Sequence, residues 1–405
     1  MARRIQCGIN IDPVNEHGNP SAREIQELGA TWVRFTFKDL SAGPHPTRFS
    51  TYDDRVREFN QGGIDCLMIL GYETYPGRPA YDADVSVWET FIANFADRCR
   101  QIALHYGDRV KAYQIWNEPD YTEPKSTYDP RAREEVFGPM LKAAFRAIKE
   151  VSSATVVVGG LVSGDPSYLE RVRAATDDGL LHADAVGVHP YGQRPTEDWP
   201  APDWGVGLLS NLIRRYHDTA HKPIWLTEIG IDDNTVQGEF PGRAFTTLNE
   251  ELAQEAPHAF WFCWSDGMVS PHGLLQVDKQ KKPSYTSFQA FALQPVMGEV
   301  PGEPPVVDYH SHYVLFPTGV GWNWYEASRH YLRKYRVTRG ESWDDAAKVH
   351  GTLGHTITCI NPTPEAIEYL RQLNPNVHLD IIHVQNVDEL QDTLDHRADH
   401  DLRFG

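Results

Sequence analysis

The chain has 405 residues, of which 56 are acidic and 38 basic, so its formal net charge is −18. This charge argues against nucleic acid or an anionic membrane surface as a partner, because both need a basic protein surface. No stretch has the apolar length of a transmembrane helix, so we expect no membrane insertion. The length exceeds the roughly 250 residues typical of a single β/α barrel, which indicates a second unit.

The chain starts with Met1-Ala2-Arg3-Arg4, which runs into the first apolar stretch without the apolar core of a signal peptide. The sequence therefore predicts a cytoplasmic protein if the chain is full length, and a secreted one if a signal was trimmed. The cysteines are odd in number and embedded in apolar stretches, which indicates buried reduced thiols rather than disulfides or a zinc site. We expect neither a metal nor a cofactor. The five cysteines are Cys7, Cys66, Cys99, Cys263 and Cys359.

Short apolar runs alternate with helical patterns through the first 293 residues. The clearest helix is predicted to open with a capping box of Ser86 and Glu89 and to end at Gly107. Such alternation is typical of parallel strands covered by helices, and eight strands predict a (β/α)8 TIM barrel. An open doubly wound sheet is the alternative, but no glycine-rich phosphate loop follows the first strand. The predicted strands span residues 6–11, 32–37, 65–70, 111–116, 155–160, 185–189, 224–227 and 259–264.

Prolines and glycines interrupt the pattern between Gln294 and Val306, as in an interdomain linker. Beyond it, strands predicted at 312–316, 336–338, 355–360 and 379–384 alternate again with helices. The predicted organisation is therefore α/β throughout: a barrel over 1–293, a linker over 294–306, and a small α/β accessory domain with a mostly parallel sheet over 307–405.

The function of the C-terminal domain is less readable than its fold. Its helices are rich in charge, and it could bind a glycan, the cell surface or another protein. His310 and His312 form an HxH pair, but no third ligand follows at a spacing useful for a metal. We therefore interpret these histidines as part of a strand.

Two glutamates stand in matching settings, each at the end of a buried-strand pattern. Glu118 lies in Trp116-Asn117-Glu118-Pro119, and Glu228 lies in Thr227-Glu228-Ile229-Gly230. The carboxyl ends of barrel strands converge at one face, where the active sites of such barrels are built. Two carboxyls about 5 Å apart there can cleave a glycosidic bond, one giving a proton and the other attacking the anomeric carbon. The alternative is a pair of strand-end salt bridges in a non-catalytic barrel.

These two motifs resemble the fourth-strand Asn-Glu and seventh-strand Glu signatures of the clan A glycoside hydrolases, among them families 39 and 5. The resemblance covers roughly residues 5 to 293. It implies a retaining β-glycosidase, with Glu118 as the general acid/base and Glu228 as the nucleophile.

The resemblance and the residue chemistry also indicate a substrate-binding set. Arg34, at the end of the second strand, is placed to keep Glu228 ionised, and Asn117 can bind the sugar 2-hydroxyl. His189 and Tyr191 match positions after the sixth strand of the clan, where the tyrosine can donate its hydroxyl to the nucleophile. Trp264, ending the eighth strand, would form the floor beneath the reacting sugar.

The segment from Tyr191 to Trp204 is long and proline-containing, and its tryptophans Trp199 and Trp204 could stack on sugars in an open cleft. An open cleft favours endo over exo action on a poly- or oligosaccharide. The expected reaction is double displacement through a covalent glycosyl-enzyme. Two alternatives stay open: a non-hydrolytic carbohydrate-binding or scaffolding barrel, and a transglycosylase that uses the same residues.

Overall fold

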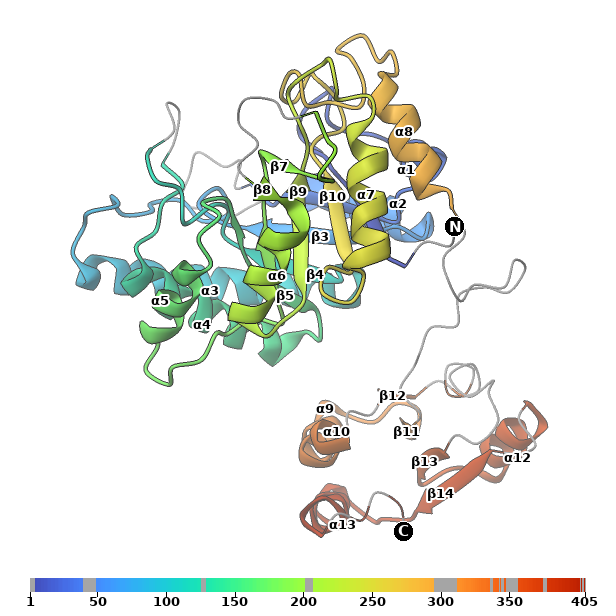
Figure 1. The fold of residues 1–405 in the computed structure, drawn as a ribbon. Helices are drawn as coiled ribbons and strands as arrows, with labels where there is room; N and C mark the ends of the chain where they lie inside the picture. The colour runs from blue at the N-terminus through green and yellow to red at the C-terminus, as the bar shows by residue number, and fades with distance from the viewer. Residues whose placement is uncertain are drawn as a thin grey trace. The chain divides into compact units, whose positions relative to one another are not determined.

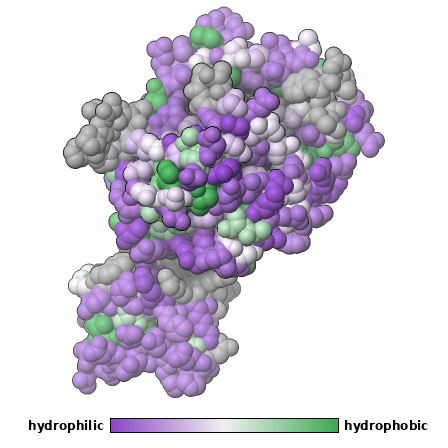
Figure 2. Space-filling model, turned by 90° about the vertical axis from the view of Figure 1, so that its left-hand side faces the viewer, coloured by the Kyte–Doolittle hydropathy of each residue, from purple (hydrophilic) through white to green (hydrophobic). Residues whose placement is uncertain are grey.

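The chain divides into two compact units, residues 1–298 and 299–405 (Figure 1). The predicted linker, apart from Gln294, lies outside the residues that can be described. Among those residues, no helix is both long and apolar enough to cross a membrane. The face drawn in Figure 2 is mostly hydrophilic, in keeping with the high charge. The computed structural model describes residues 4–38, 49–124, 129–200, 207–294, 312–335, 338–341, 343, 346, 356–373, 377–400, 402 and 404.

The first unit is a closed barrel of eight parallel strands, in the order β1-β10-β9-β6-β5-β4-β3-β2. The predicted barrel is therefore confirmed. The last strand ends earlier than predicted, at Trp261 instead of Trp264. The strands are β1 Gln6–Asn10, β2 Trp32–Thr36, β3 Asp65–Leu70, β4 Ala112–Ile115, β5 Thr155–Leu161, β6 Ala185–Val188, β9 Ile224–Ile229 and β10 His258–Trp261.

Helices surround this barrel (Figure 1). The longest, α3, buries Trp88, Phe91 and Phe95 along one stripe, as its period of 3.6 residues predicts. The predicted capping box is wrong, because α3 begins at Val85 after Asp84, and no side chain caps it. The helices are α1 Ala22–Leu28, α2 Ser50–Gln61, α3 Val85–Tyr106, α4 Glu134–Val151, α5 Ser167–Ala174, α6 Leu209–Ala220, α7 Phe240–Glu251 and α8 Pro283–Ala292; short pieces are η1 Gly107–Arg109, β7 Gln193–Arg194 and β8 Gly207–Leu208.

An aromatic layer fills the barrel near the amino ends of its strands. Trp32, Trp225 and Phe260 belong to one buried cluster. The imidazole of His258 stacks on Trp225 with ring centroids 3.8 Å apart. Side chains two positions apart in a strand share a face, so Arg34 lies in the next layer above Trp32. The interior of the barrel is thus apolar near the amino ends of the strands and polar near their carboxyl ends.

The second unit contains a four-stranded, fully parallel sheet in the order β12-β11-β13-β14. The predicted small α/β fold is confirmed. His312 is buried, with Nε2 2.7 Å from Thr358 Oγ1, whereas His310 lies outside the described residues. The elements are β11 His312–Leu315, α9 Trp322–Ala327, α10 Arg329–Tyr335, β12 Thr338–Gly340, β13 Thr356–Ile360, α12 Pro364–Leu373, β14 His378–Ile382 and α13 Val387–Asp399.

Candidate active site

The two glutamates face each other at the carboxyl end of the barrel. Glu118 follows β4, and Glu228 lies near the end of β9. A carboxylate oxygen of each lies within 4.8 Å of the other. Both residues are buried, with 4% and 7% of their surface exposed. The fold therefore brings together two carboxyls that are 110 positions apart in the sequence.

The backbone that carries Glu118 is strained. Trp116 and Glu118 both have left-handed conformations, with φ of 69° and 54°, each of which costs roughly 1–2 kcal/mol for a residue other than glycine. Surrounding contacts hold this turn, because the Trp116 indole donates to the carbonyl of Pro130 at 2.7 Å. Such over-determined strain is typical of functional sites.

Asp120 fixes the same loop from its far side. Its carboxylate accepts hydrogen bonds from the backbone N–H groups of Val162 and Ser163, at 3.0 and 2.9 Å, and from the Ser163 hydroxyl at 2.6 Å. Burial raises the pKa of Asp120, and these hydrogen bonds oppose that effect. The loop after β4 is thereby tied to the loop after β5.

A strand irregularity aims Glu228 into the site. Strict alternation would place Glu228 on the opposite face from its neighbour Thr227. The pairing of β9 with β10 shifts between Leu226 and Ile229, where β9 contains one extra residue. Bulges of this kind re-aim side chains beside active sites, and here Glu228 lines the same cavity as Glu118.

Arg34 holds four of the surrounding side chains. Its Nη1 donates to Glu228 Oε1 at 2.8 Å and to Asn10 Oδ1 at 2.5 Å. Its Nε donates to Gln114 Oε1 at 2.9 Å, and its Nη2 to Asn117 Oδ1 at 2.6 Å. The guanidinium is buried, so its charge and that of Glu228 compensate each other inside the barrel.

His189 and Tyr191 complete the surroundings of the two carboxyls. His189 Nδ1 lies 3.2 Å from Glu118 Oε1, and His189 Nε2 lies 3.5 Å from Glu228 Oε1. The Tyr191 hydroxyl donates to Glu228 Oε2 at 2.8 Å. Burial and the negative charge of Glu228 raise the pKa of Tyr191 well above its usual value. Tyr191 is therefore a stable hydrogen-bond donor to Glu228.

A glycine makes room for this arrangement. Gly160, in β5, has φ of 82°, and a Cβ there would lie 2.8 Å from Gln114 Nε2, 2.8 Å from His189 Nε2 and 3.0 Å from Asn117 Oδ1. Three site residues thus pack against a position where a side chain is excluded. The backbone angle alone also favours glycine.

The carboxyls open into a cavity of about 290 Å³, which Arg34 and Asn117 also line. Trp264, the predicted floor, is not among the described lining residues; it is buried in the hydrophobic core, and Phe262 lines the cavity instead. Trp199 is buried against Phe240 rather than presented to a sugar, and Trp204 lies outside the described residues.

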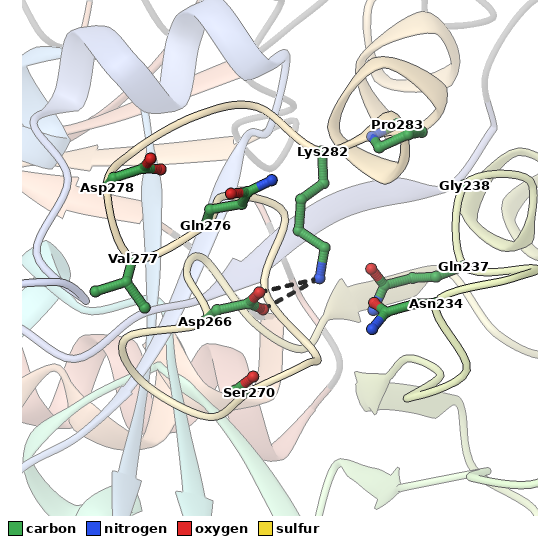
Figure 3. A pocket seen from close by; sticks show the side chains of 10 residues that line it. All are labelled: Asn234, Gln237, Gly238, Asp266, Ser270, Gln276, Val277, Asp278, Lys282 and Pro283. Atoms are coloured by element: carbon green, nitrogen blue, oxygen red, sulfur yellow. Dashed lines mark hydrogen bonds and ion pairs between the residues drawn. The ribbon is translucent and has the colours of Figure 1, made fainter.

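A larger hollow of about 620 Å³ lies between the loops that follow β9 and β10 (Figure 3). Its lining is mainly polar, and its centre is the ion pair of Lys282 Nζ with Asp266, at 3.1 and 3.2 Å. Lys282 also donates to the carbonyl of Pro271 at 2.7 Å. These charged groups satisfy each other, and the hollow contains neither of the facing glutamates.

Glu118, His189 and Glu228 form the one cluster among the described residues whose atoms could hold a metal ion. Arg34 already places a positive charge 2.8 Å from Glu228 and 3.5 Å from His189 Nε2. A dication in the same space would be repelled by this guanidinium. The donor set therefore fits an organic substrate better than a metal.

Residues 86–259 match the family model of the glycosyl hydrolase catalytic core. This stretch runs from α3 to β10 and includes both facing glutamates. Over this stretch the barrel is similar to a glycosyl hydrolase catalytic core. No curated protein matches the sequence.

Several solved structures similar to this chain are described as glycoside hydrolases or glucosidases. A family 39 glycoside hydrolase from Bacteroides cellulosilyticus WH2 has a TM-score of 0.55 and 22% identity over 72% of this chain and 64% of its own, so the match spans less than two thirds of that protein. A glucosidase from Croceicoccus marinus has a TM-score of 0.54 and 14% identity over 72% and 67% of the two chains. A β-glucosidase from Pyrococcus furiosus has a TM-score of 0.53 and 13% identity over 73% and 96%. At these identities, the similarity shows the fold.

The structure adds residues that the sequence did not single out. Asn10 and Gln114 contact Arg34 and are both buried. Asn10 Nδ2 also donates to the carbonyls of Thr227 and Trp261, at 3.0 and 3.1 Å. The available signal was an amide side chain inside an otherwise apolar strand, which requires a hydrogen-bond partner when buried.

Proposed function

We propose that the protein is a retaining glycoside hydrolase that cleaves β-linked poly- or oligosaccharides by double displacement. The observation that carries the proposal is the approach of the Glu118 and Glu228 carboxyls to within 4.8 Å. Retaining enzymes have carboxyl groups about 5–5.5 Å apart, whereas inverting ones need about 6.5–9.5 Å to admit a water.

The surroundings of the two carboxyls support different roles. Arg34 and Tyr191 both donate to Glu228, and these hydrogen bonds hold its carboxyl oxygens in the fixed position that a nucleophile needs. Glu118 instead faces the imidazole of His189, whose Nδ1 lies 3.2 Å from Glu118 Oε1, and its position on the opposite loop suits a proton donor. We therefore assign Glu228 as nucleophile and Glu118 as acid/base.

In the first step, a Glu228 oxygen bonds to the anomeric carbon as the bond to the leaving oxygen breaks, and Glu118 gives that oxygen its proton. In the second step, Glu118 takes a proton from water, whose oxygen attacks the anomeric carbon and releases Glu228 as a carboxylate. Asn117 can hold the 2-hydroxyl of the reacting sugar throughout. Arg34 acts as a positioning residue.

The test is product analysis after incubating a panel of β-linked glycans with the wild type and with Glu228→Gln. We expect shorter oligosaccharides from the wild type alone, with large products favouring endo action. Proton NMR of the first-formed product should show the β anomer. An α anomer would contradict the retaining mechanism, and binding without cleavage would favour the carbohydrate-binding barrel.

A transglycosylase would use the same two glutamates and the same covalent intermediate. Adding a large excess of sugar acceptor distinguishes the two reactions. Hydrolysis predicts free reducing ends in both conditions, whereas transfer predicts products longer than the starting glycan.

A further inference from the structure

One wall of the catalytic cavity carries charged side chains for which the proposed reaction has no use. Asp12 follows β1, Lys38 follows β2 and Glu73 follows β3, and all three line the cavity that contains Glu118 and Glu228. The strands β1, β2 and β3 are neighbours in the barrel. Their carboxyl ends therefore form one continuous side of the cleft.

The three charged side chains of this wall differ in their exposure to solvent. Lys38 Nζ pairs with Asp12 Oδ2 at 2.8 Å, and about a quarter of each side chain is exposed. Glu73 is more exposed, yet partial desolvation raises its pKa, while nearby Lys38 acts in the opposite direction. A sugar in front of Glu228 would therefore meet an ammonium group flanked by two carboxyls.

Both cations that line the described part of the cavity are already engaged. Arg34 binds Glu228 and three amide oxygens, and Lys38 binds Asp12. Meanwhile, Asp12, Glu73, Glu118 and Glu228 all face the same space. A carboxylate entering this space would lose its water and gain no cation of its own, which is unfavourable.

Hydroxyl groups suit the wall better, because each can donate to a carboxylate oxygen and accept from an ammonium group. We propose that Asp12, Lys38 and Glu73 are specificity-determining residues that bind the hydroxyls of an uncharged sugar beside Glu228 and exclude sugars bearing a carboxylate. This inference rests on the proposed function of the cleft.

The experiment applies an array of β-linked oligosaccharides, with and without uronic acids, to the whole chain carrying Glu118→Gln, which leaves the Arg34–Glu228 ion pair intact. We expect neutral oligosaccharides to bind at least about 50-fold more tightly than matched uronic-acid ones. Adding Glu73→Lys should reduce this ratio about tenfold, because it replaces a repelling charge with an attracting one. Glu250→Lys is the matched control, since Glu250 is exposed near the end of α7, at the opposite end of the barrel.

Equal or tighter binding of uronic-acid oligosaccharides, a ratio unchanged by Glu73→Lys, or no binding of neutral ones would overturn the proposal. Hydrolysis by the wild type is scored separately on the same glycans. Cleavage of uronic-acid glycans would keep the glycosidase function and reject the selectivity. Selective binding of neutral glycans without cleavage would reject the glycosidase function and keep the selectivity.

Discussion

Arg34 links Glu228, the proposed nucleophile, to the rest of the barrel, and its removal should affect both stability and activity. Arg34→Met keeps a straight side chain but leaves the Glu228 carboxylate buried without its cation. Breaking a buried ion pair from one side costs about 3–5 kcal/mol, so we expect a fall of that size in unfolding free energy by urea denaturation. We also expect kcat/KM to fall by at least about 100-fold, because Glu228 loses the group that orients it.

Arg23→Met is the control for that experiment. Arg23 pairs with Glu27 on α1, but both side chains are largely exposed. Surface pairs contribute about 0–1 kcal/mol to stability. The free energy of unfolding should therefore fall by no more than that in Arg23→Met, and kcat/KM should be unchanged. Equal losses of unfolding free energy and of kcat/KM in the two variants would contradict the role of Arg34 in orienting Glu228.

Tyr191 gives a prediction about pH. Burial and Glu228 raise the pKa of Tyr191 well above its usual value, so its hydroxyl remains protonated and continues to donate at alkaline pH. Tyr191→Phe should lower kcat/KM about 10–100-fold, as loss of a hydrogen bond to a charged group predicts. The alkaline limb of the pH–rate profile should remain where it is in the wild type; its disappearance in Tyr191→Phe would show that Tyr191 itself titrates there.

At the scale of residues, the charged residues of the site were easier to predict from the sequence than the hydrogen bonds that connect them. The sequence singled out Glu118, Glu228 and Arg34 because each stands at the end of an apolar run, and the structure brings all three together. It did not indicate Gln114, whose position inside a strand gives no sign of its partner. Trp264 was placed on the cavity floor because the strand was predicted to reach it, whereas the strand ends at Trp261.

At the scale of elements, β5 provides a test of whether the site needs its close approach. Gly160→Ala would bring a methyl group against Gln114, His189 and Asn117, so we expect a large loss of activity in initial-rate measurements. Gly63→Ala is matched in backbone strain, with φ of 67°, but a Cβ there meets nothing within 4 Å. Both variants should lose roughly 1–2 kcal/mol of stability from the backbone, while only the first should lose activity.

The aromatic layer at the amino end predicts acid sensitivity. Burial lowers the pKa of His258 from 6.5 to about 3, so the folded chain keeps this imidazole neutral where the unfolded chain protonates it. The unfolded state thus binds more protons between these values, and stability falls as the pH drops from about 6.5 toward 3. Between pH 7 and 5, we expect this residue to account for up to about 2 kcal/mol of lost stability.

The check is urea unfolding of the wild type and of His258→Phe at both pH values. Phenylalanine can retain the stack on Trp225 but cannot be protonated. The variant should therefore lose less stability on acidification. A parallel decline in the two proteins would exclude His258 as the source.

The alternation of helices with parallel strands was predictable from the apolar patterns of the sequence, but local irregularities in these elements were not. The extra residue in β9 that aims Glu228 depends on pairing with β10, a partner that the local sequence does not specify. The start of α3 was likewise misplaced, because Ser86 with Glu89 resembles a capping box although the helix begins at Val85.

At the scale of the molecule, each unit has its own hydrophobic core. We expect a chain of residues 1–294 to fold and to cleave glycans with kcat/KM within about twofold of the full chain, and calorimetry of the full chain to show two transitions. Loss of activity on truncation would show that the second unit takes part in the reaction.

The two-unit organisation was predictable from the proline- and glycine-containing interruption. No comparable sequence pattern indicates the function of the second unit.

The pairing of Arg34 with Glu228 has a consequence for how the barrel forms. The two residues are 194 positions apart, and contacts so distant in sequence form late, after the entropy of a long loop has been lost. Until β9 joins the sheet, the guanidinium has no carboxylate and stays hydrated, so the upper interior cannot become dry. An incompletely closed barrel therefore contains water where Glu228 should lie, and the proposed pair of carboxyls is completed in the same step as closure.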